Sequence, residues 1–115
     1  MLEVDGVIVV TTETIPGYRI KEIKGVASGG AVMATHIGRD IIASLRNLIG
    51  GEVKEYTELM NKAREEAFKR MVQSAKAMGA NAVIGFRFAT TAIAAQMAEI
   101  YAYGTAVVVE KVEEK

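Results

Sequence analysis

The chain has 115 residues, half of them hydrophobic and only one of them proline, which predicts a single ordered globular domain spanning residues 1–115. Lys plus Arg equals Asp plus Glu at 14 each, so the basic excess of a general nucleic-acid binder is missing. The absence of cysteine excludes disulfides. No apolar run reaches the ~18 residues that span a bilayer, and the acidic residues Glu3 and Asp5 stand where a signal peptide carries positive charge. We therefore expect a cytoplasmic protein with no membrane partner.

The first part of the chain predicts two strands joined by a tight turn. Val7 to Thr12 is a run of β-branched residues that is apolar on both faces. Pro16-Gly17 supplies the proline and the glycine that a type II turn requires at its central positions. Tyr18 to Ala34 resumes extended structure, and we expect bulges or bends at Gly25 and at Gly29-Gly30.

The middle of the chain predicts two helices. Arg39 to Ile49 carries apolar residues at helical spacing, and Gly50-Gly51 ends this helix. The second helix is long: it begins at Glu52 and keeps an apolar stripe in steps of three and four from Val53 to Met78. Gly79 stops it.

The last part of the chain predicts two more strands. Residues 81–89 alternate, which places two sets on opposite faces: Ala82, Ile84, Phe86 and Phe88 against Val83, Gly85 and Arg87. We expect the tip of a hairpin near Ala94 to Gln96. Ile100 to Val112 then forms the last strand.

The order β-β-α-α-β-β predicts a two-layer α+β domain with an antiparallel sheet and helices on one face. The strands Val7 to Val10 and Tyr101 to Val109 are apolar on both faces, while two helices can cover only one face of the sheet. Large exposed apolar patches are rare on soluble monomers, so we expect a homo-oligomer that buries the helix-free side. A sheet that curls on itself is the alternative.

Motifs for nucleotide binding are incomplete. Gly25 and Gly30 have the spacing of the glycines in a phosphate-binding loop, but Ala31-Val32 stand where Lys and Ser or Thr are required. A Gly-x-Gly-x-x-Gly motif is also missing, so no complete nucleotide-binding motif occurs and the sequence leaves any cofactor unknown.

The single histidine, His36, is the one weak candidate for a metal ligand. If a helix begins there, His36 lies one turn before Asp40 on the same face. A structural zinc site needs four ligands, so a surface histidine is the competing interpretation. Ser28 with these two residues has no geometric support as a catalytic triad, and we assign no catalytic residue.

Two arginines are the candidate ligand contacts. Arg64 lies on the apolar seam of the long helix, and Arg87 lies on the mixed face of its strand. Either guanidinium could hold an anionic ligand through a bidentate contact, or could form a structural ion pair with a carboxylate such as Glu99 or Glu13. Hydroxyl groups from three further candidates could complete such a site: Thr12, Tyr56 and Tyr103.

Several strings of residues occur together in the order typical of one family. They are Thr11-Thr12 with Pro16 to Ile20, Gly50-Gly51-Glu52 with Tyr56-Thr57 and Ala63-Arg64-Glu65, Gly79 to Gly85 with Arg87-Phe88, and Tyr103 to Val107. From about Val7 to Val109 the chain therefore resembles the YbjQ-like family of small bacterial and archaeal proteins.

The resemblance implies a dodecin-like α+β subunit built into a ring, with a pentamer as the expected assembly. It implies no particular activity. A heavy-metal-binding label is attached to the family, but this chain has no Cys and a single His. The segment Thr91 to Met97 carries no motif of the family.

Three functions stay open. A non-catalytic homo-oligomer that binds a small anionic ligand or a protein partner at subunit junctions agrees best with the doubly apolar sheet and the two arginines. The first alternative is a heavy-metal-binding module built from His36, carboxylates and Met sulfurs of several copies. The second is an enzyme with an inter-subunit site, for which the sequence offers no pair of nucleophile and base.

Overall fold

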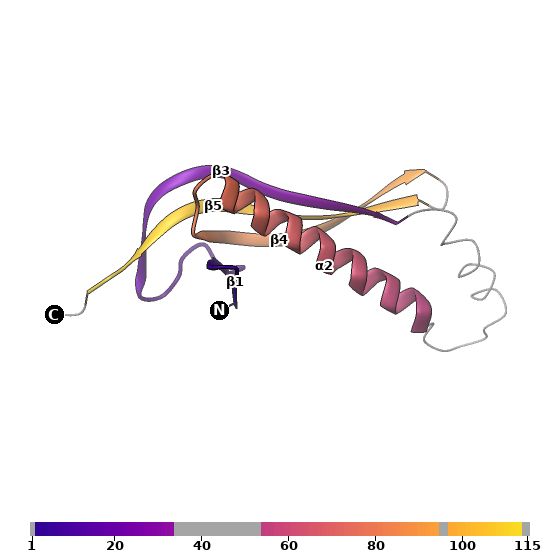
Figure 1. The fold of residues 1–115 in the computed structure, drawn as a ribbon, viewed down its shortest axis with the longest axis horizontal. Helices are drawn as coiled ribbons and strands as arrows, with labels where there is room; N and C mark the ends of the chain where they lie inside the picture. The colour runs from indigo at the N-terminus through magenta and orange to yellow at the C-terminus, as the bar shows by residue number, and fades with distance from the viewer. Residues whose placement is uncertain (1, 34–53, 95–96, 114–115) are drawn as a thin grey trace.

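The described part of the protein is a mixed β-sheet with a long helix on one face (Figure 1). The computed structural model describes residues 2–33, 54–94 and 97–113. The elements are β1 (Leu2–Val4), β2 (Val7–Val9), β3 (Tyr18–Met33), α2 (Lys54–Ala77), β4 (Ala82–Ala94) and β5 (Met97–Lys111). The sheet order is β1-β2-β4-β5-β3, which confirms the α+β class. The helix predicted from Arg39 to Ile49 lies outside the described residues.

The prediction of an antiparallel sheet is wrong at one pair of strands. β2 pairs with β4 in parallel, with Ile8 opposite Ala82 and Val9 opposite Val83, whereas the other three pairs are antiparallel. The parallel direction is possible because β3 and α2 intervene between the two strands and supply the crossover. All three residues of β2 are buried, as is common in strands covered on both faces.

The sequence interpretation missed β1, which forms a hairpin with β2. Val4 pairs with Val7, and the two residues between them, Asp5 and Gly6, have φ angles of 51° and 80°. Two positive φ angles are typical of a type I′ turn, for which Asp-Gly is a favoured sequence. This dipeptide was the signal that could have predicted β1.

Two predicted chain reversals are confirmed. The amide of Tyr18 donates a hydrogen bond to the carbonyl of Ile15 over 3.0 Å, and Gly17 has a φ of 84°, as in a type II turn. At the other end of the sheet Ala94 pairs with Met97, so β4 and β5 form the expected hairpin.

The helix α2 packs on the sheet through a seam of small residues. Their side chains are buried on both sides of the contact: Ala63, Ala67 and Ala75 on the helix, and Ala27, Ala31, Ala102 and Ala106 on the strands. The approach is closest at Gly29, where an added Cβ would overlap the carbonyl oxygen of Ala67 and the amide nitrogen of Met71. Gly29 is therefore required by helix packing.

The sequence predicts a bulge or a bend at Gly29-Gly30, and the bulge is wrong. Both glycines pair in unbroken register, opposite Ala102 and Tyr101 of β5. The register of β3 shifts earlier, between Ile20 and Glu22 and again before Gly25, which has a φ of 143°. The bend expected at Gly25 is thus present, while Gly29 serves the helix.

The other face of the sheet carries a second, smaller core. Its buried members are Ile8, Ile15, Ala82, Val107 and Val109, and none comes from α2. Residues paired across antiparallel strands point to the same face, so the register places several exposed residues beside this core. We call them the helix-free patch: Ile20, Ile23, Val26, Val32, Tyr101 and Tyr103. No helix in the described residues is long and apolar enough to cross a membrane.

The seam predicts that Gly29→Ala destabilises the protein by about 2 kcal/mol, because its methyl group meets helix backbone that has little freedom to move. Gly30→Ala is the matched control, since its Cβ would lie 3.1 Å from a carboxylate oxygen of Glu99, a side chain that can shift. Denaturant unfolding at one fixed protein concentration measures the free energy of unfolding of both variants. Equal losses for the two variants would contradict this account of the seam.

Candidate ligand-binding site

A bulge in β4 breaks the predicted alternation and shapes the candidate site. The register shifts between Ile84 and Arg87, and Gly85 within this interval has a φ of 62°. Ile84 packs with the core away from the helix, whereas Phe86 packs against the core under α2. The prediction that Ile84 and Phe86 share a face is therefore wrong, because the extra residue of the bulge reverses the parity of the strand.

Arg87 emerges directly after this bulge and bonds to main-chain carbonyls. Its Nη1 donates to the carbonyl oxygen of Thr11 over 2.9 Å and to that of Phe86 over 2.7 Å. No salt bridge joins it to Glu13, Glu99 or any other carboxylate in the part of the chain that the structure describes. The guanidinium thus fixes the place where the segment after β2 leaves β4.

Two more predicted residues lie in the same region. Tyr103 is the cross-strand partner of Arg87 and is 40% exposed. The carbonyl of Thr12 accepts a hydrogen bond from the amide of Gly85 over 2.9 Å, and its hydroxyl donates to the carbonyl of Thr14. The structure therefore brings together three of the five candidate residues, with polar groups on three strands or loops.

The remaining candidates do not join this group. Arg64 is exposed on α2 and donates to the side-chain oxygen of Asn61 over 3.1 Å, so its predicted place on the buried seam is wrong. Tyr56 lies near the start of α2, but its side chain is outside the described part of the structure. His36 and Asp40, the weak metal candidates, also lie outside the described residues.

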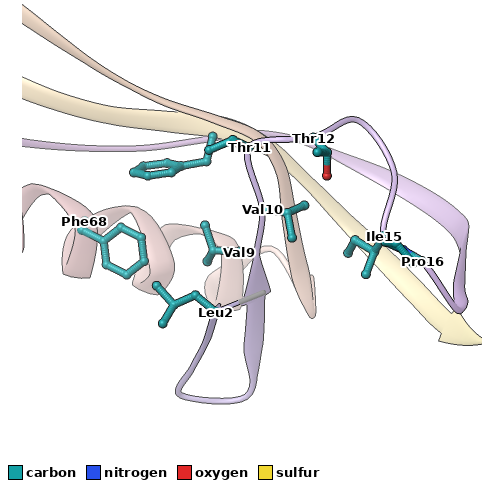
Figure 2. Close-up of a pocket in the computed structure, with 9 residues that line it drawn as sticks. Leu2, Val9, Val10, Thr11, Thr12, Ile15, Pro16 and Phe68 are labelled. Carbon is teal, nitrogen blue, oxygen red and sulfur yellow. The ribbon is translucent and has the colours of Figure 1, made fainter.

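An apolar hollow of about 720 Å³ adjoins the group (Figure 2). Its walls come from β1, from β2 and the loop that follows, from α2 and from β4: Leu2, Val9, Val10, Thr11, Thr12, Ile15, Pro16, Phe68 and Phe86. The rings of Phe68 and Phe86 meet edge to face with centroids 5.3 Å apart. Sequence reasoning missed Leu2 because it missed β1, and missed the aromatic pair because it placed Phe86 on the wrong face.

The chemistry of this region suits binding. It offers guanidinium N–H donors and a phenol beside apolar walls, which together can hold an anion and an apolar body. Among residues 2–33, 54–94 and 97–113 no three or more His, Cys, Asp or Glu side chains gather as a metal site.

We expect removal of the two arginine side chains to lower the free energy of unfolding by different amounts. Arg87→Ala leaves the carbonyls of Thr11 and Phe86 without their donor, so we expect a loss of about 1 kcal/mol in the free energy of unfolding. Arg64→Ala, the matched control, loses only an exposed contact to Asn61 and should change stability by less than about 0.5 kcal/mol. Denaturant titration of both variants tests this, and equal effects would contradict it.

Comparisons with known proteins agree on one family. A family model described as "Putative heavy-metal-binding" and named YbjQ matches residues 7–110. A UPF0145 protein of Pyrococcus horikoshii is 68% identical over 98% of this chain and 97% of its own length. A UPF0145 protein of Thermotoga maritima is 54% identical over 91% of this chain and 99% of its own length.

A solved structure supports the fold. It is a protein of unknown function of the DUF74 family from Pediococcus pentosaceus, which matches with a TM-score of 0.57 at 17% identity over 92% of this chain and 100% of that chain. At this identity the match speaks for the fold alone. The family match over nearly the whole length, with the two close relatives, shows that this chain belongs to the YbjQ-like family of UPF0145 proteins.

Proposed function

We propose that the protein is a non-catalytic, cytoplasmic homo-oligomer that binds a small anionic ligand or a protein partner beside the junctions of its subunits. The observation that carries the proposal is the helix-free patch. Ile23 and Val26 are each 68% exposed, and Val32 is 49% exposed, all on one face of the sheet. Several large apolar side chains exposed on one face of a protein mark an interaction site.

The patch is suited to a second copy of the same chain. It combines aliphatic side chains of β3 with the rings of Tyr101 and Tyr103 on β5, and aromatic residues are enriched in the cores of protein interfaces. Its position opposite α2 leaves the helix seam undisturbed when copies associate. The dodecin-like family resemblance supports a ring as the assembly, with five subunits as the expected number.

The candidate ligand residues lie next to this surface. Tyr103 belongs to the helix-free patch, and its cross-strand partner is Arg87. Copies that meet through the patch would therefore bring a partner's surface close to the guanidinium, and a site at that junction would combine groups from more than one chain. Thr12, bonded to Gly85 beside Arg87, completes the group.

Val26→Glu tests the oligomer. A carboxylate at this exposed position must lose its hydration when copies associate, so we expect the dissociation constant of the assembly to rise roughly tenfold or more. Gln73→Glu is the matched control, because it adds the same charge at an exposed position of α2. Sedimentation velocity over a concentration series measures the dissociation constant of the assembly for both variants. A monomeric parent protein at micromolar concentration would overturn the proposal.

Heavy-metal binding is the second candidate function, favoured by the description of the matching family. It would draw on His36 and Asp40 of several copies, together with Met sulfurs. Elemental analysis of protein purified without a histidine tag tests it. A stoichiometric transition metal that is lost in His36→Ala would favour this candidate over the first, whereas no bound metal after incubation with zinc and copper would eliminate it.

A further inference from the structure

The hollow beside β2 has the size and lining of a small-molecule site. Its volume of about 720 Å³ falls within the roughly 300–1,000 Å³ usual for ligand pockets. Seven of its nine lining residues are apolar: Leu2, Val9, Val10, Ile15, Pro16, Phe68 and Phe86. Figure 2 shows Leu2, Val9 and Phe68 on one side of β2 and the loop that follows it, and Val10, Ile15 and Pro16 on the other side of this segment. Such walls favour an apolar ligand body.

The polar groups of the wall are largely occupied. The hydroxyl of Thr12 donates to the carbonyl of Thr14 over 2.7 Å, and the carbonyl of Thr12 accepts from the amide of Gly85. The carbonyl of Thr11 accepts from Arg87. A ligand that binds here therefore gains little from the wall by hydrogen bonding, and its body is recognised by burial of apolar surface.

One cation stands at the margin of the hollow. Arg87 donates through Nη1 to the carbonyls of Thr11 and Phe86, and both of these residues line the hollow. A guanidinium carries five N–H groups, so Nε and Nη2 keep three donors for which the described residues supply no acceptor. Two donors in this planar arrangement match the oxygens of a carboxylate or phosphate.

We propose that the hollow binds an amphipathic anion, a molecule with an apolar chain and a carboxylate or phosphate head group, with the chain against the apolar walls and the head group at Arg87. The apolar walls supply most of the affinity, and the arginine selects the sign of the head-group charge. This inference deepens the ligand-binding part of the proposed function. It names the ligand class and adds the wall residues to the site.

The test is calorimetric titration of the intact, untagged protein with matched probes. Decanoate and decyl phosphate carry the proposed head groups, decyltrimethylammonium carries the opposite charge, and acetate lacks the chain. We expect saturable binding of the two anionic probes, at least tenfold weaker binding of the cation and none of acetate. Decanoate against decyl phosphate decides which head group is preferred. Equal binding of the anionic and cationic probes would overturn the proposal.

Variants assign the contacts. Arg87→Gln should weaken the binding of decanoate by roughly tenfold, because it removes the charge and keeps a polar side chain. Arg64→Gln, an exposed arginine elsewhere on the molecule, should have no effect. Leu2→Asp places a like charge in the hollow at a position that is 52% exposed and should abolish binding, whereas Val112→Asp, 49% exposed outside the hollow, should not. Unchanged binding in both Arg87→Gln and Leu2→Asp would refute the site.

Native mass spectrometry of the same samples separates this inference from the proposed oligomer. An oligomer that binds no decanoate would refute the amphipathic-anion site and leave the assembly standing. A monomer that binds decanoate through Arg87 would support the site and refute the assembly. If Leu2→Asp instead dissociates the subunits, a second copy fills the hollow and the proposal fails.

Discussion

The close approach of α2 to the sheet is the constraint on which the rest of the structure depends. Small residues on both sides allow it, and at Gly29 of β3 no side chain fits because helix backbone occupies the space. The contact fixes α2 along its length, and Arg70 adds a hydrogen bond to the carbonyl of Gly30 at the same place. A helix held in this way presents Phe68 to Phe86 and so sets one wall of the hollow.

The bulge at Gly85 is the second constraint, and it divides β4 between two environments. Before it, Ile84 belongs to the small core away from the helix; after it, Phe86 belongs to the core under α2. Arg87 is then turned toward the carbonyl of Thr11, beside Tyr103. One residue with positive φ thus places an aromatic ring in the wall of the hollow and a cation at its margin.

The string from Gly79 to Gly85, one of those that carry the family resemblance, is explained by architecture. Gly79 has a φ of 81° and ends α2, with its amide bonded to the carbonyl of Lys76. The side chain of Asn81 bonds to both the amide and the carbonyl of Val109, over 2.7 Å and 2.9 Å, and so ties the start of β4 to β5. These residues build the joint between helix and strand, and the candidate ligand contact, Arg87, lies two residues after Gly85.

The sequence by itself determined the α+β class, the long helix and the Pro16-Gly17 turn, because periodicity and turn chemistry are local properties. It also predicted the hairpin between β4 and β5, although that segment carries no Gly or Pro turn signal. It also named Arg87 as a candidate ligand contact, because Arg87 lies on the mixed face of its strand. Only the tertiary structure decided the parallel pairing of β2 with β4, the exposure of Arg64 and the gathering of Thr12, Arg87 and Tyr103. The parallel pairing depends on a crossover, and the exposure of Arg64 depends on which side of the helix packs on the sheet. The gathering of Thr12, Arg87 and Tyr103 depends on a bulge, which shifts a register that local alternation cannot reveal.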